Sequence, residues 1–452
     1  MQATAEPCTP PALDALLRQG PYQAYSYSYP HKSAYRPLAP PRPLANLWAG
    51  QDCSALFAYV HIPFCTMRCG FCNLFAMAQP QEPLVDAYVA ALLRQMDALN
   101  EALGERRFAR LALGGGTPSY LSAAQLETLY VALHRRLGID LAATPSGIEV
   151  SPETVTPERL AVCREMGVDR VSMGIQSFVA QELRSLARPQ QKAEVVQAIE
   201  RIRAAGFPVL NLDLIYGISG QTVASWQASI ASALAFAPEE IYLYPLYLRP
   251  QTGLGRMAIR LDEAPADGRL ALYEAARERL RDAGYEQVSM RMFRAPHAPQ
   301  EGGPVYCCQN DGMVGLGAGA RSYTTGLHYA SRYAVGRDDT RGIIQDFIAH
   351  DHGRFLQAEH GFELDAQEQR RRFVIQSLLA HPGLSYPAYT QRFGTHCLDD
   401  LPQLHELPRG GLAHDDGRQL VLSDRGTAYA DTIGPWLASP RVRALMGAAA
   451  PC

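Results

Sequence analysis

The chain has 452 residues, of which 47% are hydrophobic and 19% are charged, a composition typical of folded globular proteins. Its 42 basic and 45 acidic residues give a formal net charge of −3, which indicates neither a nucleic acid nor an anionic membrane as a partner. No apolar run approaches the roughly 18 residues of a membrane span, and the start MQATAEPCTPP does not resemble a secretory signal. The ten cysteines favour thiols and metal ligands over disulfides, and we expect a cytoplasmic protein.

Proline and tyrosine dominate the first 50 residues, as in PYQAYSYSYPHKSAYRPLAPPRPL at positions 21–44. Prolines interrupt regular helix because they lack an amide hydrogen and fix the backbone. We therefore predict that residues 1–50 form an extended arm rather than a packed domain.

Short apolar runs then alternate with helical patterns over residues 51–250. Between the first two runs, apolar residues from Val85 to Leu103 step by three and four, which indicates one buried helix face. The alternation predicts an α/β fold with a parallel sheet and right-handed crossovers. The predicted strands are 56–62, 110–116, 147–153, 170–176, 209–217 and 240–248.

The pattern changes near residue 361, after a stretch (251–360) that we expect to complete the barrel and its site. Residues 361–452 predict two helices and then a hairpin around Asp416 and Gly417, an order typical of winged-helix-like domains. Since the chain has no basic stripe, we interpret this domain as a structural element or a lid rather than a DNA reader.

Three cysteines lie within eight positions, in HIPFCTMRCGFC. Cys65, Cys69 and Cys72 have the spacing C-x3-C-x2-C, one ligand short of a usual four-coordinate site. A zinc site would need a further ligand, and a redox pair of Cys69 and Cys72 would leave Cys65 without a role. An iron–sulfur cluster held by three thiolates leaves one iron open for a ligand, and we favour this interpretation.

The motifs around these cysteines resemble the radical S-adenosylmethionine (SAM) superfamily. YVHIPFCTMRCGFC is similar to the branch typified by oxygen-independent coproporphyrinogen III oxidase, the HemN-like proteins. The resemblance covers about residues 55–330 and continues in LALGGGTPSYL, IEVSPE, RVSMGIQSF, NLDLIYG and GLGAGARSY. It implies a partial (β/α)6 TIM-like barrel with the N-terminal arm and the C-terminal winged-helix-like domain attached.

The resemblance also implies the site. A [4Fe-4S] cluster on the three cysteines would bind the amino and carboxylate groups of SAM and cleave it to a 5′-deoxyadenosyl radical, after reduction by a flavodoxin- or ferredoxin-like donor. The glycine run (114–116) and Thr117 would lie against the SAM amino group. The two acids, Glu149 and Asp213, and the amide of Gln176 would lie near its amino, sulfonium and ribose groups. Arg188 would lie near its carboxylate. Singly, each of these residues is as well explained by a turn, by core packing or by an ordinary polar contact. The implied cofactor-binding residues are Tyr59, Phe71, Gly114, Gly115, Gly116, Thr117, Glu149, Gln176, Arg188, Asp213 and Ile215.

The branch contains several activities on small molecules. We favour a radical SAM enzyme that uses a second SAM for methyl or methylene transfer. Oxidative decarboxylation of the coproporphyrinogen type and heme trafficking without radical turnover are the alternatives. The coproporphyrinogen oxidases have a further cysteine where this chain has Asn73, Leu74 and Phe75, and the heme carriers have a histidine near the place of Cys307 and Cys308; both departures weaken the alternatives.

The arm sequence YSYSYPHKSAYRP (25–37) allows two compatible interpretations. Its alternating tyrosines suit an edge strand that packs on the barrel. It also suits a cover that excludes water from radical chemistry. In the second case the side chains facing an anionic or planar substrate would be Tyr27, Tyr29, His31, Lys32 and Arg36.

Overall fold

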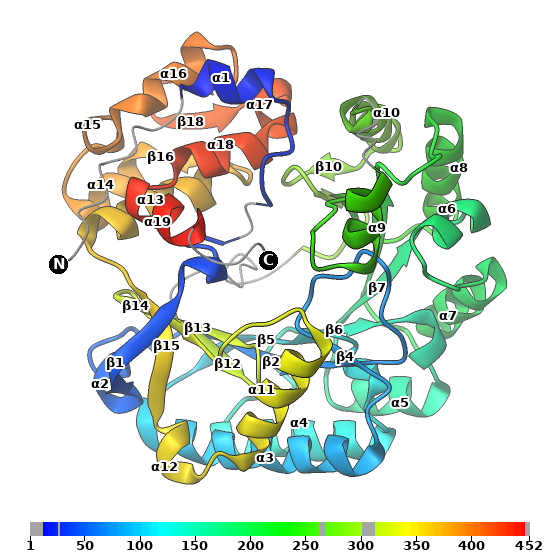
Figure 1. Ribbon diagram of the computed structural model, residues 1–452, viewed down its shortest axis with the longest axis vertical. Helices are drawn as coiled ribbons and strands as arrows, with labels where there is room; N and C mark the ends of the chain where they lie inside the picture. The colour runs from blue at the N-terminus through cyan, green and yellow to red at the C-terminus, as the bar shows by residue number, and fades with distance from the viewer. Residues whose placement is uncertain (1–11, 26–27, 262–266, 301–311, 448–452) are drawn as a thin grey trace.

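The structure is a computed structural model that describes residues 12–25, 28–261, 267–300 and 312–447 (Figure 1). Six parallel strands form its centre, and each lies within two residues of a predicted strand start, so the predicted α/β fold is confirmed. They are β2 (Leu56–Ile62), β5 (Phe108–Gly115), β6 (Ser146–Val150), β7 (Arg170–Gln176), β8 (Val209–Tyr216) and β9 (Glu240–Pro245).

Helices cover the outer side of these strands (Figure 1). The apolar face predicted from Val85 to Leu103 is buried, because α3 packs on α4 and on the sheet beneath them. The covering helices are α3 (Glu82–Leu103), α4 (Ala123–Leu137), α5 (Pro157–Glu165), α6 (Ala180–Ser185), α7 (Lys192–Ala204), α8 (Val223–Leu234) and α10 (Arg269–Asp282). α9 (Gly253–Leu261) instead lies at the end of the barrel that carries the three motif cysteines. None of the helices in the described ranges has both the length and the apolar character of a membrane span.

The sheet extends beyond the six strands at both edges to a total of 13. At one edge β12 (Met313–Leu316) pairs in parallel with β2, and antiparallel strands follow it. These are β13 (Arg321–Tyr323), β14 (Leu327–Ala330), β15 (Gln357–Glu363) and β1 (Arg36–Pro43), with α2 (Leu44–Trp48), α11 (Arg337–Ala349) and α12 (His352–Phe355) beside them. At the other edge β11 (Met292–Arg294) and β10 (Glu286–Gln287) follow β9. The outermost strands β1 and β10 do not pair, so the barrel stays open, as a partial barrel requires.

The C-terminal unit has its own core above the barrel (Figure 1). The predicted hairpin around Asp416 and Gly417 is present as β17 (Ala413–Asp415) and β18 (Gln419–Leu422). The other elements are α13 (Ala366–Leu378), β16 (Leu384–Ser385), α14 (Tyr386–Phe393), α15 (Cys397–Asp400), α16 (Glu406–Arg409), α17 (Asp424–Ala428), α18 (Ala430–Leu437) and α19 (Pro440–Gly447). The domain boundaries drawn from the sequence stay predictions.

The N-terminal arm joins the barrel to this C-terminal unit. Its proline-rich part, β1, is an edge strand paired with β15, whereas α1 (Leu13–Arg18) contacts α18. Tyr29 and Tyr35 lie in the core of the C-terminal unit, and the Tyr29 hydroxyl donates to buried Glu368. The arm is therefore part of the C-terminal core over much of its length, because its aromatic side chains find apolar partners there.

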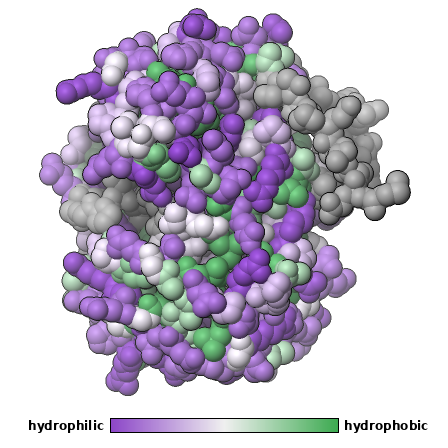
Figure 2. Space-filling model, turned by 90° about the vertical axis from the view of Figure 1, so that its left-hand side faces the viewer, coloured by the Kyte–Doolittle hydropathy of each residue, from purple (hydrophilic) through white to green (hydrophobic). Residues whose placement is uncertain are grey.

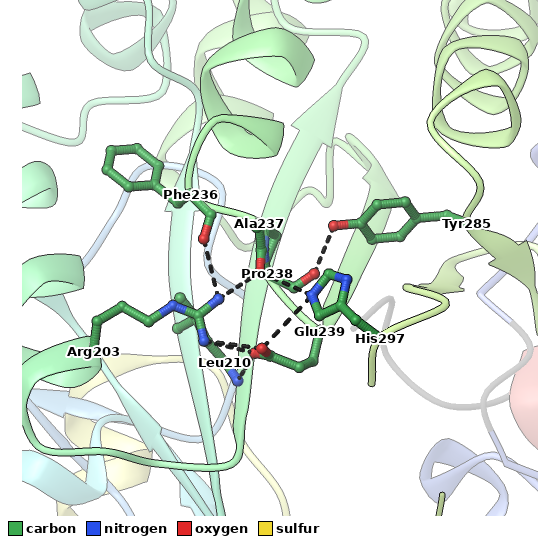
Figure 3. A network of polar contacts seen from close by, with 8 residues as sticks. All are labelled: Arg203, Leu210, Phe236, Ala237, Pro238, Glu239, Tyr285 and His297. Carbon is green, nitrogen blue, oxygen red and sulfur yellow. Dashed lines mark hydrogen bonds and ion pairs between the residues drawn. The ribbon is translucent and has the colours of Figure 1, made fainter. Parts of the chain in front are cut away.

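A polar network fixes the amino-terminal edge of the parallel strands (Figure 3). Glu239, just before β9, accepts hydrogen bonds from Arg203 of α7 at 2.9 and 3.0 Å and from the Leu210 amide of β8 at 2.7 Å. Tyr285 donates to the neighbouring Pro238 carbonyl at 2.6 Å. The network therefore ties a helix to two strands at the end of the sheet that is opposite the predicted site.

We expect Glu239→Ala to lower the free energy of unfolding by about 2 kcal/mol, since it leaves the buried Leu210 amide without its acceptor and removes the carboxylate that pairs with the partly exposed Arg203 guanidinium. Chemical denaturation of the metal-free protein measures this loss. Asp97→Ala is the matched control: it breaks the exposed Asp97–Arg136 pair and should cost less than about 1 kcal/mol. Equal losses in the two variants would contradict the assigned role of the network.

Candidate active site

The three motif cysteines lie in the loop after β2 and line one large cavity of about 860 Å³. Cys65 forms part of the short strand β3 (Phe64–Cys65), which pairs with β4 (Met77–Ala78). All three sulfurs are free thiols. Gly116 packs directly beneath: a Cβ at this position would lie 2.9 Å from the Cys65 sulfur and 2.7 Å from the Phe64 carbonyl oxygen. The glycine run therefore lets the end of β5 approach the cysteine loop.

Burial makes Cys65 and Cys72 poor thiolates unless a cation accompanies them. It raises the pKa of Cys65 to about 12 and also raises that of Cys72, and the neighbouring sulfurs add to both shifts. Thr117 Oγ1 lies 3.5 Å from the Cys65 sulfur, and Arg188 Nη1 lies 3.1 Å from the Cys69 sulfur. A positively charged iron centre would supply the missing cation and hold the thiolate form.

The donor set fits an iron–sulfur cluster. Within the described ranges, no three His, Cys, Asp or Glu side chains are gathered closely enough to hold a single metal ion, which a cluster does not require because each thiolate binds a different iron. Cys65, Cys69 and Cys72 would hold such a cluster. Their three sulfurs leave one iron for an external ligand.

Three parts of the chain hold the cysteine loop in place. The Gly70 amide donates to the Leu186 carbonyl at 3.0 Å, and the Leu254 amide of α9 donates to the Gly70 carbonyl at 2.9 Å. On another side, Arg68 donates to the Val335 carbonyl. A Cβ at Gly70 would lie 3.0 Å from the Leu186 oxygen, so this glycine too is required by a close approach.

Two carboxyl groups line the same cavity from strands β6 and β8: Glu149 is open to the cavity, and Asp213 is half-buried. Its position deep in the cavity, with little bulk water around it, raises the pKa of Glu149 to about 7, although the Gly115 amide donates to it at 3.0 Å, and the nearby Asp213 raises it further. Burial likewise raises the pKa of Asp213 to about 6, against a hydrogen bond of 2.8 Å from Asn211. Both carboxyls take up or release protons near neutral pH, as expected of groups that receive a cationic ligand.

The structure gathers most of the predicted cofactor-binding residues at this cavity. Gln176 ends β7 with a φ of +64°, an unusual backbone for a side-chain-bearing residue. Gly114 does not line the cavity, but a Cβ there would lie 2.9 Å from the Tyr59 hydroxyl. Their roles towards SAM stay predictions. The predicted residues that line the cavity are Tyr59, Phe71, Gly115, Gly116, Thr117, Glu149, Gln176, Arg188, Asp213 and Ile215.

The arm also reaches the cavity, where Tyr29, His31 and Lys32 line it. Burial and the neighbouring cations lower the pKa of His31 to about 3, so its ring is neutral. Arg36, predicted to face a substrate, instead donates to the carbonyls of Ser33, Tyr35 and Leu445 and is not among the lining residues. Its guanidinium ties the arm to α19. Tyr27, Cys307 and Cys308 lie outside the described residues.

Several lining residues were not predicted from the sequence. His61 shares a face of β2 with Tyr59; its Nδ1 lies 3.3 Å from the Tyr59 hydroxyl and its Nε2 lies 3.0 Å from the Phe75 carbonyl. The i, i+2 spacing of these two residues was a signal that could have revealed it. Arg249 and Arg321 carried no such signal, because they reach the cavity from segments far apart in the chain.

The fold and this site define a radical SAM protein. The chain matches the family model described as Radical SAM superfamily over residues 59–233. It is 30% identical over 274 residues to a protein of Lactococcus lactis named heme chaperone HemW, covering 60% of this chain and 70% of the relative. It is 28% identical over 397 residues to oxygen-independent coproporphyrinogen III oxidase of Pseudomonas aeruginosa, covering 84% of each.

The fold comparison agrees with the sequence comparison. The structure of coproporphyrinogen III oxidase (HemN) from Escherichia coli matches 94% of this chain and 98% of its own, with a TM-score of 0.78 and 24% identity. The chain belongs to the HemN-like branch of the radical SAM superfamily.

We expect Gly116→Ala to disturb the cysteine loop, since its methyl group would overlap the Cys65 sulfur and the Phe64 carbonyl. After anaerobic reconstitution, iron analysis should give less than about half of the four irons per chain that a [4Fe-4S] cluster contains. Gly326→Ala is the control, because a Cβ there meets nothing within 4 Å. Full iron content in Gly116→Ala would contradict the close packing.

We also expect the affinity for SAM to rise between pH 5.5 and pH 7.5. The carboxyls with raised pKa are protonated at the lower pH, and their ionised forms attract the cationic ligand at the higher pH. Glu149→Gln should bind SAM about tenfold more weakly at pH 7.5 and show a flatter pH dependence. Equilibrium dialysis measures both. Glu153→Gln, at an exposed carboxyl on the cavity edge, should keep the slope, and an unchanged slope in Glu149→Gln would refute the assignment.

Proposed function

We propose that this protein cleaves SAM reductively and uses the resulting radical on an anionic small molecule. One observation supports the proposal most strongly: the three thiols, the carboxyl pair Glu149 and Asp213, and a group of cationic side chains line the same cavity. A reduced [4Fe-4S] cluster with SAM bound supplies a 5′-deoxyadenosyl radical, which removes a hydrogen atom from a substrate. The chain's own residues bind, orient and enclose the reactants.

The cationic side chains support an anionic substrate. Lys32 of the arm, Arg249 after β9, Arg321 of β13 and Arg443 of α19 all line the cavity. Guanidinium and ammonium groups are suited to bind carboxylates and phosphates. His31 lies among three of these cations and is neutral, so it adds no further positive charge to this group.

The walls of the cavity are suited to radical chemistry. Tyr29 and Lys32 line it from the arm, and Pro435 and Ala438 line it from the C-terminal unit. Tyr247 donates to buried Asp431, which links the barrel rim to α18. These elements cover the open side of the barrel and limit the access of water and oxygen.

For the reaction itself we propose transfer of a methyl or methylene group from a second SAM. Both SAM molecules and the substrate would lie in the large cavity, which extends from the cysteine loop to the arm. Oxidative decarboxylation is the second candidate. The cationic lining favours it, since a substrate with several carboxylates needs several cations.

The deciding experiment is anaerobic turnover with SAM, dithionite and coproporphyrinogen III as a probe, followed by mass spectrometry. We expect 5′-deoxyadenosine from the native protein and none from Cys69→Ser, which lacks a ligand for the cluster. S-adenosylhomocysteine beside it supports carbon transfer, and carbon dioxide from the probe supports decarboxylation. If an intact cluster gives no 5′-deoxyadenosine while heme binds stoichiometrically without SAM, the proposal is wrong and heme trafficking replaces it.

A further inference from the structure

A second, smaller cavity lies on the outer side of the cysteine loop. It has a volume of about 250 Å³ and is formed by α6, the loop after it and the start of α7. Arg188 lines both this cavity and the large one. With 9% of its surface exposed, it stands between them, and its guanidinium lies 3.1 Å from the Cys69 sulfur.

The same loop contacts the cysteine loop a second time. The Leu186 carbonyl accepts from the Gly70 amide at 3.0 Å, and a Cβ at Gly70 would lie 2.9 Å from the Ala187 Cβ. Ala187 is itself exposed to solvent, with a φ of +49°. One layer of residues therefore separates the cysteine loop from the surface here.

The outer side of the loop is also where a reductant has room. The inner side faces the large cavity, which the substrate and SAM would occupy. Another side is covered by the chain itself, where Tyr333 donates to the Asn73 carbonyl and Arg68 donates to the Val335 carbonyl. The side chain of Arg188 alone separates the second cavity from the Cys69 sulfur, so an electron that enters there has a short path to the cluster.

Two exposed cationic side chains flank the second cavity. Arg184 and Lys192 are exposed, and neither forms an ion pair within the described part of the chain; Arg184 donates only to the neutral Gln181. The two nearby carboxylates already accept hydrogen bonds from within the chain. Glu182 is buried and accepts from three side chains, and Glu194 caps α7 by accepting from the Gln191 amide at 3.1 Å.

From this placement and charge we propose that the surface formed by Arg184, Lys192 and the intervening loop is the docking site of an acidic one-electron carrier protein. The inference rests on the proposed function, because only a redox-active cluster needs a donor. In each transfer the carrier loses one electron and the cluster gains one, and no atom or proton is transferred. Opposite charges speed the encounter of two such proteins and fix their orientation.

The test compares Arg184→Glu/Lys192→Glu with the native protein, using reduced flavodoxin as the probe. We expect the variant to bind flavodoxin at least about tenfold more weakly at low ionic strength, measured by titration calorimetry, and to be reduced correspondingly more slowly. Salt should weaken binding to the native protein much more than binding to the variant. Arg135→Glu/Arg341→Glu makes the same change of charge on α4 and α11 and should leave flavodoxin binding as in the native protein.

Small reductants separate a docking defect from damage to the site. Dithionite and reduced methyl viologen have opposite charges, and both should reduce the cluster and support SAM cleavage in the variant at the native rates. Native flavodoxin affinity in the variant, or equal losses with every reductant, would overturn the docking site. Failure of the native protein to cleave SAM with small reductants, while flavodoxin still binds and loses affinity in the variant, would instead overturn the proposed function.

Discussion

The site depends on holding three cysteine sulfurs around one cavity in a half-buried loop. Neutral thiols are stable there, but thiolates are not without a cation, as the raised pKa of Cys65 indicates. The loop must therefore be fixed by other interactions before any metal arrives. Gly116 beneath Cys65, and the backbone bonds of Gly70 to Leu186 and Leu254, provide that support. Each comes from a different crossover of the barrel, so the closure of the site requires the whole sheet.

The C-terminal unit and the arm depend on each other in the same way. Tyr29 donates to Glu368, and Ser439 donates to the same carboxylate at 2.7 Å, so a buried acid holds the arm against α19. Arg291 of the barrel pairs with buried Asp431 of α18 and lies 3.9 Å from the centre of the Tyr25 ring. Because breaking a buried pair leaves an uncompensated charge, these contacts keep the upper wall of the cavity in place. Hydrophobic side chains gather near the middle of the face in Figure 2, between this unit and the barrel.

The sequence predicted the parts of the fold that local patterns encode. Strand β7 coincides with the predicted range, and the hairpin of β17 and β18 lies where Asp416 and Gly417 indicated a turn. The cysteine loop and the acids Glu149 of β6 and Asp213 of β8 were recognisable because each carries its own motif. The seven additional strands were not, since β1 and β15 are 314 or more residues apart and their pairing leaves no local signal. The sequence predicted an arm that packs on or covers the barrel, but for the same reason it did not predict that Tyr29 and Tyr35 belong to the C-terminal core.

The cationic side chains that line the cavity also left no local signal in the sequence. Together with the acids, they give the cavity one positive and one negative region. Lys32, Arg249 and Arg321 come from the arm, a loop and an added strand, and only the folded chain brings them to one place. The acids Glu149 and Asp213 come from the central strands. A ligand with a positive centre is thus favoured near the strands, and one with negative groups is favoured near the arm. This separation of charge supports a cavity that receives a cationic cofactor and an anionic substrate side by side, since each would be repelled from the other's position.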